Sequence, residues 1–258
     1  MNRAFREIET WGTVIVVDVA SQHQSSEFLE SAIDGAHQYF IKVDQLLSTW
    51  IAESEVSRLR RGEISIGDCS PEVQEVWQAC LFARELTTGA FDPWSVNGGF
   101  DPSGFVKGWA ADKACDTFVA QGIESCLVNA GGDIAVRGGR YVDGALHPWT
   151  IEIRNPAIPS EVVHSISISN GAVATSGTYE KGSHIHDPWT GLIAIGCSSA
   201  TVWGPNGGVA EAMATALIVS GKDGARWFSQ PDLAEYSAWC IDRGDDTSWS
   251  ISGADFPH

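Results

Sequence analysis

The sequence predicts a single α+β domain over residues 1–258, with a mostly antiparallel sheet as its core and helices packed around it. Helical periodicity is concentrated in the first half of the chain and strand-like alternation in the second. Short, hairpin-length gaps separate many of these segments, which is the order of an α+β domain rather than of a doubly wound parallel sheet. At 43% hydrophobic residues, the chain can bury one full core.

The helices are predicted from apolar residues that recur at spacings of three and four, so that one face of each helix is buried. Ser25 or Ser26 is expected to cap the first helix. Ser70-Pro71-Glu72 is typical of a helix start, because it combines a capping hydroxyl, a proline and an acid. Helices are expected at 26–47, from Pro71 towards Gly89, after Lys107 and at 208–219, with a short turn or helix at 54–59.

The strands are predicted from short β-branched runs and from alternation with a period of two. The first run, at 10–19, is almost wholly apolar, so a buried strand is expected there. The others are expected at 126–129, 134–136, 149–153, 163–169, 171–178, 193–203, 236–241 and 249–251.

Charge and cysteine content exclude several classes of function. A formal net charge of −17 argues against nonspecific affinity for nucleic acid or anionic membranes, whose phosphates need Lys and Arg. The six cysteines form no C-x-x-C pair. Five of them lie in apolar runs and are interpreted as small core residues: Cys80, Cys115, Cys126, Cys197 and Cys240. Their even number permits a disulfide, but reduced thiols are expected. No run approaches the ~20 apolar residues of a membrane span.

The first ten residues contain no apolar signal segment and no early cysteine for lipid attachment. We therefore expect a cytoplasmic protein, or a periplasmic one if a preceding leader has been removed.

The stretch from Asp101 to Lys113 is the first candidate site. Gly104 and Gly108 flank Lys107 ahead of an Ala-rich helix, so bare backbone and a cation lie beside a helix N-terminus. This environment suits an anion, although glycine before a helix is more often simple turn chemistry. In so acidic a chain, a phosphate would have to be held locally, with a metal ion.

Glu211 and Thr215 form the second candidate site. They lie four residues apart on a predicted helix and so share a face. A carboxylate and a hydroxyl on one face make a hard oxygen site that suits magnesium. The alternative is a solvated acid and a threonine that bonds to its own backbone.

Two more segments carry polar groups that could act on a ligand. His184 and His186 precede Asp187-Pro188, which permits a general base near neutral pH. Zinc is conceivable there, but no third ligand is visible in the sequence. The hydroxyls around Gly177 could donate to phosphate oxygens or could form a plain turn.

Large aromatic residues make up the last candidate set. Trp11 precedes Gly12, and Trp50 ends the Ser48-Thr49-Trp50 segment. Such rings can stack on a flat ligand ring, although eleven tryptophans make any single one weak evidence.

In this order and spacing, the motifs resemble those of the ApbE-type flavin transferases, enzymes that move FMN from FAD onto a Ser or Thr of a target protein. The resemblance covers nearly the whole chain, from Trp11 to Leu217. The matching segments are 11–13, 48–50 with 54–59, 89–93, 104–112, 129–134, 174–180, 184–191 and 210–217.

The resemblance implies an ApbE-like fold and a magnesium-dependent FAD:protein FMN transferase that releases AMP. FAD would be the substrate, and an acceptor flavoprotein with a target Thr or Ser would be the partner. The implied magnesium ligands are Glu211, Thr215 and the backbone carbonyl of Val106. Lys107 would offset pyrophosphate charge, and His184 or Asp187 would take the acceptor's proton. The implied FAD contacts are Trp11, Trp50, Ala90, Phe91, Asp92 and Trp109, with Thr175, Ser176 and Gly177 near the pyrophosphate.

The sequence departs from the family pattern at four positions. Glu211 stands where Asp is usual, Trp11 replaces Met, Arg60 replaces Asn and His186 replaces an aliphatic residue. Two alternatives therefore stay open: an FAD pyrophosphatase, or a non-catalytic FAD-binding protein that has lost catalysis through Glu211.

Overall fold

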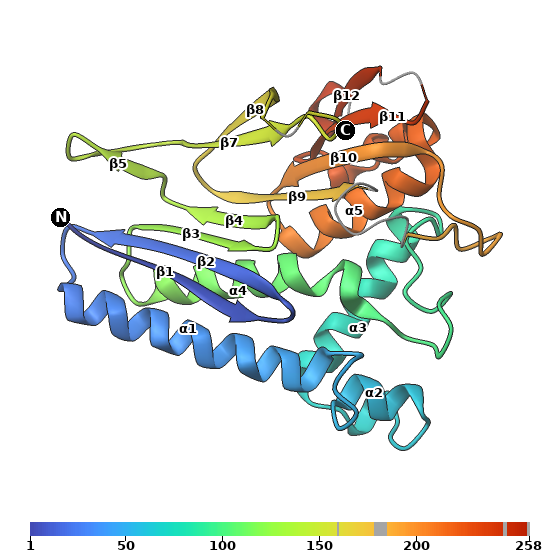
Figure 1. The fold of residues 1–258 in the computed structure, drawn as a ribbon, viewed down its shortest axis with the longest axis horizontal. Coiled ribbons are helices and arrows are strands. Elements are labelled where there is room, and N and C mark those ends of the chain that lie inside the picture. Colours follow the sequence, from blue (N-terminus) through green and yellow to red (C-terminus); the bar gives the residue numbers. More distant parts are fainter. Residues whose placement is uncertain (159, 178–184, 245–246, 257–258) are drawn as a thin grey trace.

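The computed structural model describes residues 1–258 apart from 159, 178–184, 245–246 and 257–258 (Figure 1). Its centre is an eight-stranded sheet in which every neighbouring pair is antiparallel. The predicted α+β class and antiparallel core are confirmed. The strands lie in the order β1 (Asn2–Thr10), β2 (Thr13–Ser21), β3 (Ser125–Ala130), β4 (Asp133–Arg137), β9 (Gly171–Gly177), β10 (Cys197–Gly204), β11 (Ser237–Asp242) and β12 (Ser248–Ser252).

The helices gather on one face of this sheet (Figure 1). They are α1 (Ser26–Leu47), α3 (Pro71–Leu86), α4 (Val106–Ala120) and α5 (Gly207–Ser220), with the short α2 (Glu55–Arg60) at the far end of α1. Helix α5 is buried on most of its surface, because it packs against both α4 and the strands β9 and β10. Its first turn is therefore held from several directions.

Helices α1 and α3 begin where the sequence predicted, whereas α4 begins at Val106 and so contains Lys107 in its first turn instead of following it. The Ser25 hydroxyl accepts the Phe28 N–H at 3.1 Å and so caps α1. Helix α3 begins at Pro71 as predicted, but the buried Ser70 hydroxyl makes no hydrogen bond. The Ser70 backbone N–H instead donates to Glu55 at 2.7 Å, so Ser70 is anchored through its backbone.

A hairpin of β7 (Trp149–Arg154) and β8 (Val162–Ile168) covers part of the opposite face of the sheet. Its inward side chains, such as Ile151 and Ile166, pack with Val173 of β9 and Trp239 of β11. A smaller pair, β5 (Arg140–Val142) and β6 (Ala145–His147), extends from the same side. The sheet is thus enclosed between a helical layer and a hairpin layer.

The sequence did not predict β1. Only Ala4 and Ile8 of this strand are buried, so its alternation is weak, and full pairing with β2 is what holds it at the sheet edge. The strand predicted at 193–203 begins only at Cys197, because Ile193 pairs with His186 in an isolated bridge instead. Strands β5 and β6 and the 3-10 helix at Gly221–Ser229 were also not predicted.

All six cysteines are buried and free, which agrees with the core interpretation of five of them and adds Cys69 to the buried set. Among the described residues, no helix combines the length and the apolar character that a membrane crossing requires.

Candidate active site

Helices α4 and α5 cross at their first turns, where Gly108 faces Gly207. A Cβ on Gly207 would lie 2.5 Å from the Gly108 carbonyl oxygen, and a Cβ on Gly108 would collide with the Gly207 carbonyl oxygen. Only glycine permits backbones to approach this closely. The crossing brings together two predicted regions. One is the stretch around Lys107, which was expected to bind phosphate, and the other is the helix of Glu211 and Thr215, which was expected to bind magnesium.

Lys107 lies at the centre of this crossing. Its ammonium contacts Asp133 Oδ2 at 2.5 Å and also pairs with Glu211 Oε1. The side chains of Asp133 and Glu211 are 4% and 3% exposed, whereas that of Lys107 is 24% exposed. Lys107 is therefore the member of the cluster that a ligand can most readily reach, which suits an anionic ligand.

The cluster holds two carboxylates against one ammonium, so its formal charge is −1. The pKa of Glu211 is raised to about 7, because burial and the nearby Asp133 outweigh the opposite effects of Lys107 and the Gly108 N–H. Burial by itself would lower the pKa of Lys107, but Asp133 and Glu211 bring it above its ordinary value. The carboxylates of the cluster therefore outnumber its cations.

Hydroxyl groups lie one helical turn beyond Glu211. Thr215 Oγ1 is 3.1 Å from Ser176 Oγ at the end of β9. A Cβ on Gly104 would lie 3.5 Å from Thr215 Oγ1 and 3.2 Å from the Phe91 ring. The structure thus brings the predicted residues Phe91, Ser176 and Thr215 together beside the Lys107 turn.

These residues fit a magnesium ion by their chemistry. The Glu211 carboxylate and the Thr215 hydroxyl are hard oxygen donors, and a backbone carbonyl from Val106 would come from the residue next to Lys107. A divalent cation would also correct the negative charge of the cluster. Among the described residues, no group of three or more His, Cys, Asp or Glu side chains could hold a metal, so this site depends on hydroxyl and backbone oxygens.

The predicted aromatic contacts occupy different environments. Trp50 is 94% exposed, so its ring is free to stack on a ligand. Trp11 is partly buried, and its indole N–H donates to the Phe40 carbonyl at 2.9 Å. Trp109 is 4% exposed and donates to Glu75 at 2.9 Å, which leaves little of its ring open.

The loop after α3 is tightly held. Ala90 is 1% exposed, and the Asp92 carboxylate accepts from Arg84 at 2.8 Å and from the Trp94 N–H at 3.0 Å. The Asp92 side chain is therefore already engaged in hydrogen bonds within the protein.

The remaining predicted residues lie around the end of β9 and beyond it. Thr175 Oγ1 is 2.9 Å from Thr201 Oγ1, and Gly177 is the last residue of β9. Asp187 Oδ1 accepts from the Trp189 N–H at 2.8 Å, so this oxygen shapes a turn. His184 lies outside the described residues.

The site contains one residue that the sequence reasoning did not assign to it. Asp133 lies in the family-like segment 129–134 but was given no role, yet it pairs with Lys107. Gly131 and Gly132 have φ of 65° and 103°, and the Asn129 side chain accepts the Gly132 N–H at 2.8 Å. An acid that directly follows such a turn was the available signal.

The fold and site define an α+β protein whose centre combines a partly exposed lysine, two buried carboxylates and paired hydroxyls at a crossing of helices. The chain belongs to the ApbE family, whose model matches residues 11–98 and 95–238.

Curated relatives carry the name FAD:protein FMN transferase. The chain is 37% identical to that of Rhodobacter capsulatus over 132 residues, which are 48% of this chain and 24% of the relative. It is 37% identical to that of Vibrio cholerae over 134 residues, which are 48% of this chain and 39% of the relative. The matches thus span well under half the length of these relatives.

Solved structures share the fold over almost the whole chain. The flavin transferase ApbE from Vibrio cholerae superposes with a TM-score of 0.82 at 24% identity, and 99% of each chain is covered. The ApbE protein from Thermotoga maritima gives a TM-score of 0.82 at 22% identity, with 98% of each chain covered. The predicted ApbE-like fold is confirmed.

Proposed function

We propose that this protein is a magnesium-dependent FAD:protein FMN transferase that moves FMN from FAD to a Thr or Ser of an acceptor flavoprotein and releases AMP. The observation that carries the proposal is the pairing of Lys107 with Glu211 at the crossing of α4 and α5, beside the hydroxyls of Thr215 and Ser176. The names of the curated relatives support the same activity.

Lys107 and a magnesium ion would together explain how so acidic a protein could bind FAD. The pyrophosphate of FAD carries two negative charges, which the chain's net charge of −17 would repel. Lys107, the most exposed member of the cluster, would pair with the pyrophosphate, and Ser176 would donate a hydrogen bond to it. The exposed ring of Trp50 would stack on the flavin or the adenine.

Glu211, Thr215 and the carbonyl of Val106 would hold the magnesium ion. When bound, magnesium supplies positive charge that stabilises the pyrophosphate and the phosphate oxygen on which AMP leaves. Thr215 and Glu211 are four residues apart on α5, so one rigid helix would orient both ligands.

Transfer requires the acceptor's hydroxyl oxygen to bond to the FMN phosphorus while the bond from that phosphorus to the AMP oxygen breaks. AMP leaves with the electron pair of the broken bond, and the hydroxyl proton passes to a base. We assign the base to His184, which the family resemblance supports. The Asp187 oxygen that accepts from Trp189 would instead shape the turn that follows.

The test incubates the purified protein with FAD, Mg²⁺ and the acceptor protein of one of its curated relatives. Mass spectrometry of the acceptor should show a gain corresponding to one FMN, on a Thr or Ser, together with free AMP. Free FMN and AMP with an unmodified acceptor would overturn transfer in favour of pyrophosphate hydrolysis. Bound FAD without turnover would show that this chain only binds the dinucleotide.

A further inference from the structure

The crossing of α4 and α5 contains two matching contacts, each from an acid of one helix to a backbone N–H of the other. Glu211 of α5 accepts the Gly108 N–H of α4 at 2.9 Å. Asp112 of α4 accepts the Gly207 N–H, which belongs to the first residue of α5. Each acid lies four residues after the glycine of its own helix, so both point into the crossing.

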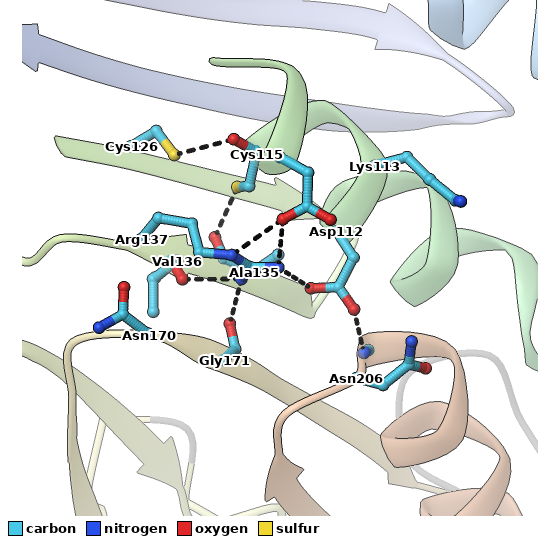
Figure 2. Close-up of polar contacts among 12 residues, drawn as sticks. Asp112, Lys113, Cys115, Cys126, Ala135, Val136, Arg137, Asn170, Gly171 and Asn206 are labelled. Atoms are coloured by element: carbon cyan, nitrogen blue, oxygen red, sulfur yellow. Dashed lines mark hydrogen bonds and ion pairs between the residues drawn. The ribbon is translucent and has the colours of Figure 1, made fainter. Parts of the chain in front are cut away.

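Asp112 is itself anchored to the sheet. Its second oxygen accepts from Arg137 Nη2 at 3.1 Å, and the same nitrogen donates to Asp116 at 2.8 Å (Figure 2). Arg137 Nη1 donates to the carbonyls of Val136 at 2.9 Å and Gly171 at 3.2 Å. The start of α5 is therefore tied through Asp112 and Arg137 to β4 and to the start of β9.

We propose that Asp112 is a positioning residue for the metal ligands of α5. By holding the Gly207 N–H, Asp112 sets where the first turn of α5 begins, and Glu211 lies one turn further along. Glu211 reaches back to Gly108 of α4, so the two contacts close a loop that determines the placement of its carboxylate. This inference rests on the metal site of the proposed function.

The chemistry of the contact explains why the position is sensitive. The first N–H groups of a helix have no partner within the helix, and a buried one needs an acceptor. Asp112 is 5% exposed, so water cannot readily replace it. Magnesium requires nearly ideal octahedral coordination, so a small displacement of the Glu211 carboxylate lowers the affinity of the site for the ion.

The experiment compares Asp112→Asn with Asp116→Asn. The first variant keeps the size of the side chain but has one acceptor oxygen for two donors, Gly207 and Arg137. The control removes a carboxylate from the same arginine, but Asp116 is 62% exposed and has no contact with α5 in the described interactions. Both variants are compared with the unmodified protein. Mn²⁺, which is paramagnetic, is the probe for the proposed metal site.

Two readouts are expected to separate positioning from general stability. In Asp112→Asn, the Mn²⁺ affinity measured by electron paramagnetic resonance should fall about tenfold or more, as for a lost supporting contact. Amide exchange of Gly108, whose N–H donates to Glu211 and not to Asp112, should accelerate relative to core amides of α1. In Asp116→Asn, both quantities should stay within about twofold of the unmodified protein.

Equal Mn²⁺ affinity and equal Gly108 exchange in the two variants would overturn the inference. If the unmodified protein binds no Mn²⁺, the metal part of the proposed function fails, and the Gly108 exchange still decides whether Asp112 controls the crossing. If Asp112→Asn does not fold, Arg137→Lys takes its place, since it removes the forked anchor of Asp112. A Gly108 exchange rate in that variant equal to the Asp116→Asn control then overturns the inference.

Discussion

Lys107 and Glu211, 104 residues apart in the sequence, form an ion pair across the crossing of α4 and α5. The pair exists because two glycines let the helix backbones touch, and β4 adds Asp133 as a second partner of Lys107. Three separate elements therefore supply the charges of one cluster. The consequences for packing, titration and ligand binding can each be measured.

Replacing Gly108 by Ala should destabilise the protein by at least about 2 kcal/mol. The new Cβ would meet the carbonyl oxygen of Gly207, and neither backbone can move without disturbing the other helix. The matched control is Gly35→Ala in α1, where a Cβ would have no neighbour within 4 Å. That variant should gain about 0.5–1 kcal/mol through helix propensity. Urea denaturation measures both, and an unchanged stability of Gly108→Ala would contradict the close crossing.

The metal-free protein should lose stability as the pH rises through neutrality. Burial raises the pKa of Glu211 from 4.5 to about 7 in the folded state. The folded state then favours the protonated form, so this group's contribution is complete below pH 4.5 and is lost as the pH passes about 7. The expected loss between about pH 5.5 and about pH 8 is roughly 2 kcal/mol.

The Glu211→Gln variant isolates this effect, because its amide does not titrate in that range. Urea denaturation of both proteins in the presence of a chelator should give a stability difference that changes with pH as described. A difference that is independent of pH would show that Glu211 ionises with an ordinary pKa.

Replacing Thr215 by Val should weaken Mn²⁺ binding about tenfold or more while the fold is kept. Valine has the shape of threonine but lacks the oxygen that is proposed as a metal ligand and that lies 3.1 Å from Ser176 Oγ. The control is Ser237→Ala, which removes a hydroxyl from the 2.9 Å pair with Ser252 at the far end of the sheet. Similar Mn²⁺ affinities in the two variants, measured by electron paramagnetic resonance, would remove Thr215 from the ligand set.

Replacing Trp50 by Ala should lower FAD affinity about tenfold with little effect on stability. The ring is 94% exposed and so adds little to the core, whereas stacking on a flat base is worth about 1–3 kcal/mol. Quenching of FAD fluorescence measures the affinity, and thermal unfolding measures the stability. Phe5→Ala is the control, because Phe5 is 53% exposed on the edge strand β1. Equal FAD binding by both variants would exclude Trp50 as a contact.

The sequence predicted the elements whose own residues determine them. Helix α1 begins and ends where the spacing of apolar residues indicated, and its capping serine lies at the expected position. Strand β1 was missed, because it faces solvent over most of its length and is held by hydrogen bonds to β2. Local patterns are informative when burial is one-sided and regular, and they weaken at an exposed sheet edge.

The candidate site likewise contains some residues that the sequence predicted and others that it did not. Lys107, Glu211 and Thr215 were selected from glycines, spacing and family resemblance, and they do lie together at the crossing. Asp133 was not selected although it follows the Gly131-Gly132 turn, and Asp112 was not selected because no local pattern marks its contact with Gly207. Trp109 was selected as a flavin contact, but its ring packs against Tyr39 and its N–H donates to Glu75.

The sequence by itself determined the α+β class, most helices and strands, the acidic charge and the residue types of an oxygen site. Only the tertiary structure decided that the helices starting at Val106 and Gly207 cross in contact, so that each provides an acid for the other's backbone. The physical reason is that helix and strand formation depend on neighbours a few residues away. Charge balance in a buried site depends instead on groups about a hundred residues apart, which only the packing of the sheet and helices brings within hydrogen-bond distance.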